Sequence, residues 1–537
     1  MKLKYIWLAT LALQFAACSN DDDNSSSPSD NHPDLITGTA DFTTYVALGN
    51  SLTSGYTDNA LFIAAQNNSF PNILSSKFKL IGAGDFNQPL MNDNYGGLAL
   101  GGTRLPGINP RLVTTGGGPV ALESVIGDVT VSTDIVTNNP SGPFNNMGVP
   151  GAKSYHLLAH GYGNLANLSA GLANPYFVRM TGSTPDASVL ELAMSQSPTF
   201  FSLWIGNNDV LGYALSGGDD TNPITETATF DYAYNILINT LTSGGAKGVV
   251  ANLPYVTSIP HFTTVPYNPL SPQNLQFAAQ IPTLNMVYGA LNQIFIALGE
   301  SERAIVFSDS EASAVVIKDE TLADLSSQIT GALLASPTFP AFLQQMGLPA
   351  EAAPIVAPLL GTTYGQVRQA NANDLFVLPS MSIIGTVNST IANALMSQGL
   401  PEHIAQQFAS EGITLPLEDK WVLIPAEQDQ IKTAIDQFNS TIKNAATQGQ
   451  LAFVDANMIL QQVANGGYGY GNFILNNALV TGGAFSLDGV HPTSRGYALL
   501  ANEFMRAIDA TYDTNFEASE NLVNLGDYPT NYSPLLQ

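Results

Sequence analysis

An aspartate and a histidine late in the sequence have the spacing of a catalytic acid–base pair. Asp488 precedes His491 by three residues in the segment Asp-Gly-Val-His-Pro. At this spacing the carboxylate can reach one ring nitrogen and fix the tautomer, so that the other nitrogen can act as a base. None of the other five histidines has an aspartate three positions earlier. A turn-forming Asp488, with His491 at the start of a helix, is the structural alternative.

A serine that could act as nucleophile follows the first predicted strand. Residues 42–48 are rich in aromatic and aliphatic side chains and stop at Gly49, which indicates a buried strand ending in a turn. Ser51 then lies at the carboxyl end of that strand, where open α/β sheets place their reactive groups. Taken alone, the motif fits a helix-capping serine equally well.

Two turns rich in glycine and asparagine could supply hydrogen-bond donors. Residues 206–209 directly follow a second predicted buried strand, and residues 145–152 end in Pro-Gly-Ala. Ester hydrolysis needs donors directed at the developing oxyanion, and a glycine N–H together with an asparagine amide can provide them. Each turn alone is more often purely structural, but all four segments rarely occur in this order by chance.

Together, the four segments resemble the sequence blocks of the SGNH, or GDSL-type, hydrolases. The matching positions are 49–52, 151, 206–209 and 488–491. The resemblance implies a flavodoxin-like three-layer α/β/α sandwich. It also implies a serine esterase or lipase that cleaves carboxylic esters through an acyl-enzyme, with no metal and no organic cofactor.

The family's catalytic residues carry over to three positions of this sequence. Ser51 matches the nucleophile, His491 the general base, and Asp488 the residue that orients the base. The departure is Asn50, where the family has an aspartate. Because a neutral amide can still make the hydrogen bonds of the loop, we expect Asn50 to alter local geometry more than to remove activity.

The resemblance also assigns an oxyanion hole. Its donors would be the backbone N–H groups of Ser51 and Gly151 and the side chain of Asn208. Gly148 competes for the glycine role, but Gly151, followed by Ala152 and a helix-like segment, fits the block better.

Composition excludes several other classes of protein. Forty-three acidic residues against 17 basic ones give a net charge of −26, which disfavours binding to nucleic acid. A hydrophobic fraction of 45% fits a packed globular body. The single cysteine excludes an intramolecular disulfide and a cysteine-rich zinc site.

The first 40 residues predict an exported, membrane-anchored chain. Residues 1–17 carry two lysines and then a mainly apolar stretch, the pattern of a signal peptide. The small residues before Cys18 resemble the lipobox of bacterial lipoproteins, with Phe15 replacing the usual aliphatic residue, so Cys18 is the expected lipidation site. Residues 18–40 predict a flexible acidic tether, whose opening resembles the surface-export signal of Bacteroidetes lipoproteins. We therefore expect an outer-membrane lipoprotein exposed at the cell surface; an acidic linker that is merely soluble is the alternative.

Residues 41–537 predict one hydrolase domain with insertions. Strands and helices alternate, which indicates a mostly parallel α/β sheet. The predicted strands are 200–205, 248–253, 304–307 and 451–454, and the predicted helices are 229–241, 283–298, 425–446 and 494–512. Residues 57–145 have no sustained period and are predicted to be a long loop region. Residues 310–420 have short helix-like apolar pieces and predict a helical insertion resembling a lid.

The sequence is compatible with three hypotheses about the ligand or substrate. An apolar insertion could line a channel for an acyl chain, which favours a lipase or carboxylesterase. The Gly-, Asn- and Tyr-rich residues 465–472 could instead stack on sugars, which favours a carbohydrate O-deacetylase of the same fold. A surface lipoprotein that binds glycans or proteins without catalysis is the third reading.

Overall fold

The computed structural model describes residues 32–537. The predicted signal peptide, the lipidation site Cys18 and most of the predicted tether lie outside the described residues. Over the described range, none of the helices combines the length and the apolar character needed to cross a membrane.

The centre of the molecule is a five-stranded parallel sheet. The strands lie in the order β13-β8-β7-β1-β6, and every neighbouring pair is parallel. Numbered along the chain and read from the β6 edge, this is the order 2-1-3-4-5 that occurs in flavodoxin-like doubly wound sheets. The predicted α/β class with a central parallel sheet is therefore confirmed. The strand bounds are β1 Tyr45–Gly49, β6 Asn146–Gly148, β7 Phe200–Trp204, β8 Lys247–Ala251 and β13 Ala452–Val454.

Helices cover both faces of this sheet. On one face α19 (Ser494–Tyr512) packs against α3 (Phe70–Phe78), with the rings of Phe70 and Phe504 4.7 Å apart. On the other face lie α6 (Val189–Met194), α8 (Thr227–Thr242) and α17 (Pro425–Gln448), with Phe230 stacked on Phe438 at 4.1 Å. Side chains of a strand alternate between faces, so β7 contributes to both layers.

Shorter elements surround the sheet. The helices are α1 Ser51–Ser54, α2 Ile63–Asn67, α4 Glu123–Ile126, α5 Pro175–Val178, α7 Asn208–Leu215, α9 Pro260–Thr263 and α18 Ala456–Ala464. The strand pairs are β2 Ala99–Leu100 with β3 Thr103–Arg104, β4 Leu112–Val113 with β5 Val120–Ala121, and β14 Tyr468–Tyr470 with β15 Phe473–Leu475. The predicted loop region 57–145 thus contains the helices α2, α3 and α4 and two of these short strand pairs, β2 with β3 and β4 with β5. The prediction is wrong for α3, a short amphipathic helix with one buried face.

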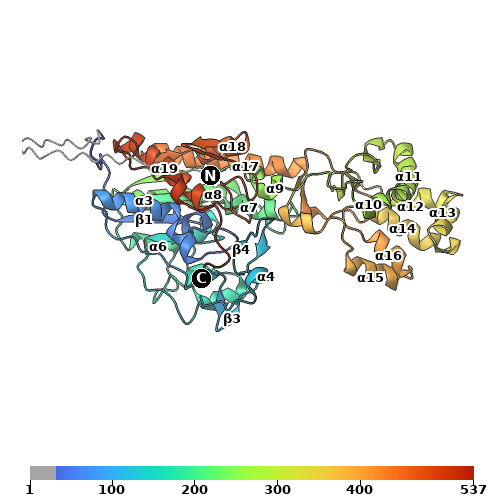
Figure 1. Cartoon of the computed structure of the whole chain (residues 1–537), viewed down its shortest axis with the longest axis horizontal. Helices are drawn as coiled ribbons and strands as arrows, with labels where there is room; N and C mark the ends of the chain where they lie inside the picture. The colour runs from blue at the N-terminus through green and yellow to red at the C-terminus, as the bar shows by residue number, and fades with distance from the viewer. Residues whose placement is uncertain (1–31) are drawn as a thin grey trace, which may run out of the picture.

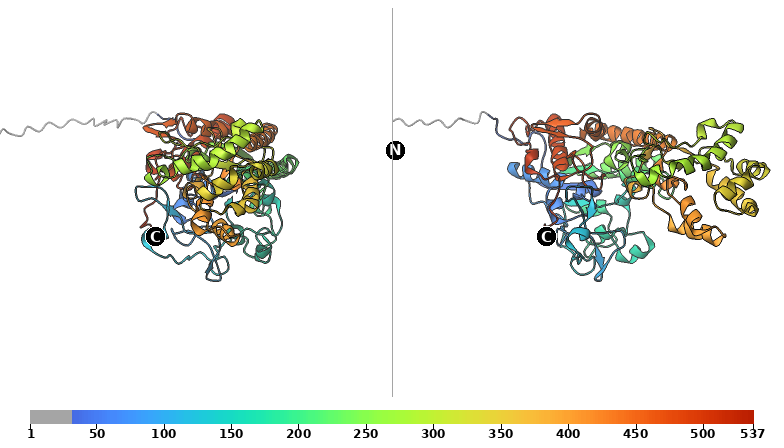
Figure 2. Two further views of the ribbon diagram at one scale, coloured as in Figure 1. Left: turned by 90° about the vertical axis from the view of Figure 1, so that its right-hand side faces the viewer. Right: turned by 45° about the vertical axis from the view of Figure 1, so that its right-hand side comes forward.

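A second body, which we call the projection, extends away from the sheet (Figures 1 and 2). It has its own apolar core, drawn from residues between Val265 and Ile424. Its helices are α10 Leu275–Ala278, α11 Ile281–Ala297, α12 Ser326–Ala335, α13 Phe339–Gln345, α14 Ala353–Tyr364, α15 Ser389–Ser397 and α16 Glu402–Phe408. Its strand pairs are β9 Val316–Lys318 with β10 Val367–Gln369, and β11 Leu375–Phe376 with β12 Val422–Leu423. The helical region therefore starts well before the expected residue 310.

One predicted strand is absent from the projection. Residues 304–307 are extended but form no ladder with another strand. Their backbone pairs instead with side-chain amides: Asn292 binds both the N–H and the carbonyl of Ile305, and Asn285 does the same for Phe307. The prediction of a strand is therefore wrong: the chain is extended, but side chains of α11 provide hydrogen-bond partners for its backbone.

Both flanking segments of the domain pack on the body. The N–H of Thr39 donates to the carbonyl of Tyr512 at 2.7 Å, and the N–H of Ile36 donates to the side chain of Asn515. Residues 36–40 of the predicted tether are therefore part of the folded body. Farther along, the buried guanidinium of Arg111 donates to the carbonyl of Ser533 at 2.7 Å, so the C-terminal residues pack on the body.

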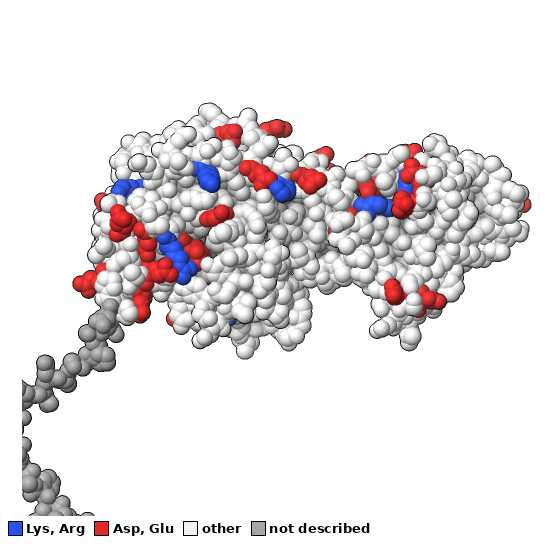
Figure 3. All heavy atoms as spheres, turned by 90° about the horizontal axis from the view of Figure 1, so that it is seen from above, with Lys and Arg blue, Asp and Glu red and all other residues white. Residues whose placement is uncertain are grey.

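The surface carries few charges, in keeping with the 11% of charged residues in the sequence. Figure 3 shows acidic and basic side chains scattered over one face, with broad uncharged areas between them on both the body and the projection. The acidic excess is thus spread over the molecule on this face.

We expect Phe504→Ala to destabilise the body strongly, because Phe504 is fully buried between α3 and the sheet. Removing a buried phenylalanine costs about 3–5 kcal/mol of unfolding free energy. The measurement is urea unfolding followed by circular dichroism. Tyr232→Ala on α8 is the control, since Tyr232 is 69% exposed and its loss should change stability by less than about 0.5 kcal/mol.

Candidate active site

The structure brings Ser51, His491 and Asp488 into one hydrogen-bonded line. The Oγ of Ser51 lies 2.9 Å from Nε2 of His491, and Nδ1 of the same ring lies 2.8 Å from Oδ2 of Asp488. With the ring proton on Nδ1, His491 donates to the carboxylate and accepts the serine hydroxyl proton. Ser51 begins α1, immediately after β1, so the sheet fixes one end of the line.

The carboxylate of Asp488 is held by its own loop. Oδ1 accepts the hydroxyl of Ser486 and the N–H groups of Val490 and His491 at 2.8–2.9 Å. Burial opposes ionisation of Asp488, but the interaction with His491 and these hydrogen bonds outweigh it, so the pKa of the carboxyl lies below its ordinary value. Asp488 therefore stays charged and can stabilise a protonated His491.

A tight turn at Thr57–Ala60 clamps this loop from outside. The N–H of Asn59 donates to Oδ2 of Asp488 at 2.9 Å, and Asp58 receives the N–H of Leu487 at 3.1 Å. Asp58 and Asn59 both have positive φ angles, 51° and 61°. Short polar residues tolerate this left-handed conformation better than other non-glycine residues, so an Asp-Asn pair suits this turn.

Asn50, the departure from the family motif, is buried, and both its amide oxygen and its amide nitrogen form hydrogen bonds. Its Oδ1 accepts the N–H of Leu52 at 3.0 Å and so caps α1, and its Nδ2 donates to Oδ1 of Asn207 at 3.3 Å. An aspartate could form the cap but could not donate to Asn207. The amide therefore adds a link between the first and third sequence blocks.

Gly151, not Gly148, lines a cavity together with the nucleophile candidate Ser51. Gly148 belongs to β6, its N–H donates to Oδ1 of Asn146, and a Cβ there would lie 2.3 Å from the backbone of Ser54. Gly151 has φ +80° and lines a cavity together with Ser51 and His491. Its N–H donates to no group among residues 32–537, so it is free to bind a ligand.

Asn208 lines the same cavity at the start of α7. One hydrogen of its amide donates to the carbonyl of Ala152 at 2.9 Å, which orients the side chain and leaves the second hydrogen for a ligand. The neighbouring Asp209 is fully buried and accepts the N–H and hydroxyl of Ser154 at 2.8 and 2.7 Å. These bonds tie the second and third sequence blocks together.

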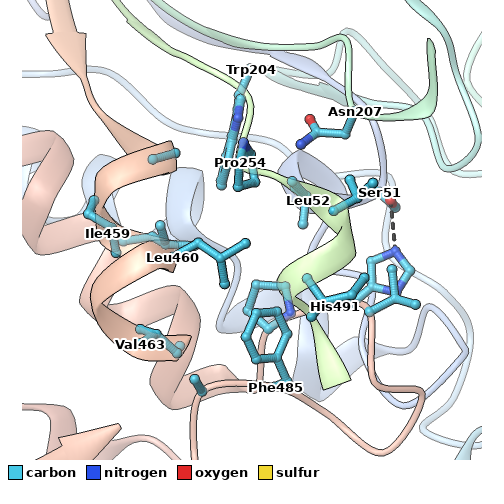
Figure 4. Close-up of a pocket in the computed structure, with 18 of the residues that line it drawn as sticks. Ser51, Leu52, Trp204, Asn207, Pro254, Ile459, Leu460, Val463, Phe485 and His491 are labelled. Carbon is cyan, nitrogen blue, oxygen red and sulfur yellow. Dashed lines mark hydrogen bonds between the residues drawn. The ribbon is translucent and has the colours of Figure 1, made fainter. Parts of the chain in front are cut away.

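Two pockets meet at Ser51 and His491, and we call them the inner and outer pockets. The inner pocket is the more enclosed and contains about 820 Å³ not filled by atoms, solvent at its mouth included. Figure 4 shows it between α18 and the serine. Its walls are mainly apolar, with Trp204, Ile459, Leu460, Val463, Phe485 and Leu499 among them.

The outer pocket is more open and carries more polar side chains. Two candidates for the oxyanion hole, Gly151 and Asn208, line it. Its other lining residues include Tyr56, Asn59, Tyr176 and His261. No residue between 310 and 420 lines either pocket. The expectation that the helical insertion lines the acyl channel is therefore wrong, because its apolar side chains fill the core of the projection instead.

The site contains residues that sequence reasoning missed. The sequence analysis did not identify Asp58, Asn59 or His261, because none of them stands at a motif spacing from another candidate catalytic residue. The consecutive Asp-Asn pair seven residues after Ser51 is a turn signal, but nothing in it specifies a contact with Asp488. Tyr56, whose ring lies 4.7 Å from that of His491, was missed for the same reason.

One group of carboxylates has the spacing of metal ligands. Oxygen atoms of Glu320, Asp419 and Glu427 lie within 4.8 Å of one another where the projection joins the body. Burial raises the pKa of Asp419 and of Glu427, so shared protons can compensate the clustered charge. None of the three lines the pockets at Ser51.

Part of the chain matches a known protein family. A model of the GDSL-like lipase/acylhydrolase family matches residues 341–504. The matched range contains Asp488 and His491 but also much of the projection, and Ser51, Gly151 and Asn208 lie before it. No curated protein and no solved structure matches the chain. The match supports the SGNH/GDSL family and an ester-hydrolysing activity in general.

Asp58 gives the site a pH-dependent stability. Burial raises its pKa to about 7, although the Leu487 N–H and Arg111 lower it. The folded state thus prefers the neutral carboxyl, so stability is lost as the pH rises from about 4 to about 7. The asparagine of Asp58→Asn does not titrate. The free energy of unfolding of this variant, relative to that of the wild type, should therefore rise across this window, by up to about 4 kcal/mol at pH 8. Melting curves from pH 4 to 8 measure this; a difference independent of pH would contradict it.

Proposed function

We propose that the chain is a serine esterase that cleaves carboxylic esters through an acyl-enzyme intermediate. The observation that carries this proposal is the continuous line from Ser51 Oγ through His491 to Asp488, with both distances below 3 Å. Nucleophile, base and orienting carboxylate within hydrogen-bond reach are the arrangement that activates a serine. The proposal extends the general ester-hydrolysing activity to a mechanism and named residues.

In the first step, Ser51 Oγ attacks the ester carbonyl carbon while Nε2 of His491 takes the hydroxyl proton. The negative oxygen would be stabilised by the N–H groups of Ser51 and Gly151 and the side chain of Asn208. His491 then gives its proton to the departing alcohol, and the acyl group remains on Ser51. In the second step, His491 takes a proton from water as the water oxygen attacks the acyl carbon. The bond between the acyl carbon and Ser51 Oγ then breaks, His491 returns the proton to Oγ, and the carboxylic acid leaves.

The inner pocket supports an apolar acyl chain as the group transferred to Ser51. Its walls between Ser51 and α18 are mainly aliphatic and aromatic, and the pocket begins at the nucleophile (Figure 4). Each methylene of an acyl chain placed there would gain about 0.8 kcal/mol from leaving water. The pocket therefore favours esters with several acyl carbons over acetates.

The two other readings have less support. Residues 465–472, which motivated the deacetylase, do not line either pocket, and the hydroxyl of Tyr468 donates to Glu503 of α19. A protein that only binds ligands would have no need of a histidine hydrogen-bonded on both sides, to Ser51 and to Asp488. The complete line favours catalysis.

We further propose that the chain is a surface-exposed outer-membrane lipoprotein anchored through Cys18. The support is the pattern of residues 1–17 and the acidic stretch after Cys18, which lie outside the described residues. Anchoring would hold the esterase close to lipid or glycan esters.

A fluorophosphonate probe tests the nucleophile directly. We expect residues 34–537 to be labelled, and Ser51→Ala or His491→Ala to lose labelling and to reduce ester hydrolysis at least 1,000-fold. The Ser51→Ala variant should keep the circular dichroism spectrum and melting curve of the wild type. Labelling is read by in-gel fluorescence.

Ser54→Ala is the matched control for this experiment. Ser54 belongs to the same helix, but its hydroxyl donates to the carbonyl of Ser51 and does not reach His491. This variant should keep its labelling. Labelling that survives in Ser51→Ala would show that another residue is the nucleophile and would refute the proposal.

Filling the inner pocket should shorten the preferred acyl chain. Val463 on α18 lines the pocket and is buried, so Val463→Phe should lower kcat/KM for an octanoate ester at least tenfold and leave an acetate ester nearly unchanged. Met458→Phe adds an aromatic ring to the same helix at a position that is 54% exposed, and should alter neither. Equal losses for both esters in Val463→Phe would mean that the acyl chain lies elsewhere.

A further inference from the structure

Asn207 carries an amide group that the proposed mechanism does not use. The residue lies between β7 and α7, is 7% exposed, and lines the inner pocket but not the outer one. In Figure 4 the amide points to the side of the pocket formed by Trp204 and Pro254. It is thus a polar group in a wall that is mainly apolar.

The hydrogen bonds of Asn50 fix which end of this amide faces the pocket. Oδ1 of Asn50 accepts the N–H of Leu52, so Nδ2 is the end that Asn50 presents to Asn207. Asn207 offers an acceptor in return, and its Oδ1 lies 3.3 Å from Nδ2 of Asn50. The nitrogen of the Asn207 amide is thereby turned away from Asn50.

This nitrogen is available to a ligand. Nδ2 of Asn207 donates to no group among residues 32–537, and it is not one of the side-chain atoms of that range that are both unpaired and closed off from solvent. Because Asn207 is buried apart from its contact with the inner pocket, the opening is toward that pocket. A primary amide has two N–H donors, so the wall offers hydrogen bonds to an acceptor.

Asn207 lies at the end of the pocket where an acyl chain would begin. Its partner Asn50 directly precedes Ser51, and Asn207 itself precedes Asn208, the candidate donor to the carbonyl oxygen. The far wall of the pocket is the apolar face of α18 (Figure 4). An acyl chain on Ser51 would therefore pass Asn207 with its first carbons and reach α18 with its later ones.

We propose that Asn207 binds an oxygen atom carried on the second or third carbon of the acyl chain. The inference rests on the proposed esterase function and adds the class of acyl group: the preferred substrates are esters of hydroxy or oxo acids. An N–H donor needs an acceptor, and a hydroxyl oxygen and a keto oxygen both accept. These two groups are the sources of the same chemistry.

Other acyl chains fit this wall less well. A plain alkyl chain would displace water from the Asn207 nitrogen without replacing the hydrogen bond, and an unpaired buried amide costs free energy. A chain with a second carboxylate would bring a charge into a pocket that, within the described residues, has no lysine or arginine in its walls. A neutral oxygen near the scissile ester is the group that the wall can recognise.

Five ethyl esters with the same chain length isolate this oxygen. They are ethyl octanoate and the ethyl esters of 2-hydroxy-, 3-hydroxy-, 2-oxo- and 3-oxooctanoic acid, and release of the acid is followed by titration at constant pH. The preference is the kcat/KM of a substituted ester divided by that of ethyl octanoate. Because the substituents also change the intrinsic reactivity of the ester, each preference is compared between enzyme variants.

Asn207→Leu removes the donor and keeps a side chain of similar size. For the 2- or the 3-substituted pair of esters, we expect the hydroxy and the oxo preference both to fall by about tenfold from their wild-type values, the effect of one or two neutral hydrogen bonds. Asn235→Leu is the matched control. Asn235 lies on α8 and lines neither pocket, so this variant should keep the wild-type preferences.

Asn50→Asp tests the orientation of the Asn207 amide without changing Asn207. An aspartate accepts but does not donate, so the amide of Asn207 would turn its nitrogen to position 50 and its oxygen to the pocket. A hydroxyl can donate to that oxygen, whereas a keto group cannot pair with it. The oxo preference should therefore fall as in Asn207→Leu, while the hydroxy preference is kept.

The outcomes separate this inference from the esterase proposal. Melting curves show whether Asn207→Leu is folded; if it is not, the oxo preference of Asn50→Asp decides. Preferences unchanged in folded Asn207→Leu, or an oxo preference unchanged in Asn50→Asp, would overturn the inference. Fluorophosphonate labelling of Ser51 is measured in parallel. Labelling with unchanged preferences refutes the acyl-group inference alone, whereas absence of both labelling and hydrolysis refutes the esterase and the inference with it.

Discussion

The structure depends on keeping a charged carboxylate buried at Asp488. A buried ion is tolerated only when hydrogen bonds replace its water, and here the donors come from two distant parts of the chain. Ser486, Val490 and His491 supply donors from the same loop, while Asn59 supplies one from the turn after α1. The turn can reach Asp488 only because β1 and α19 are fixed on the same sheet. The sheet, the turn and the loop are therefore required together, and His491 is oriented as their joint result.

Much of the sheet and the central line of the site could be predicted from sequence. Continuous apolar runs ending in glycine, as at Gly49 and Gly206, identify buried parallel strands, and reactive residues cluster after them. The contacts of Asp58 and Asn59 could not be predicted, because a turn signal specifies local conformation and not its partner 429 residues away.

The errors in the projection have a different cause. Residues 304–307 have the composition of a strand. The N–H and carbonyl groups of the backbone need hydrogen-bond partners, but these need not belong to a neighbouring strand. The amides of Asn285 and Asn292 on α11 bind that backbone from the side. Likewise, apolar helices between 310 and 420 were expected at the substrate, but a body standing apart from the sheet must first fill its own core. Apolar content alone does not distinguish a core from a binding wall.

The wide separation of the proposed catalytic residues also bears on when the proposed activity can arise. Ser51 and His491 are 440 positions apart, and the clamp on Asp488 spans almost the same length of chain. At typical rates of synthesis of 5–20 residues per second, roughly 20–90 s separate the two residues as they leave the ribosome. During that time Ser51 has no base and the inner pocket lacks the walls contributed by α18 and α19. On the proposed mechanism, a nascent chain is thus chemically silent, and hydrolysis begins only once nearly the whole body has been made and folded.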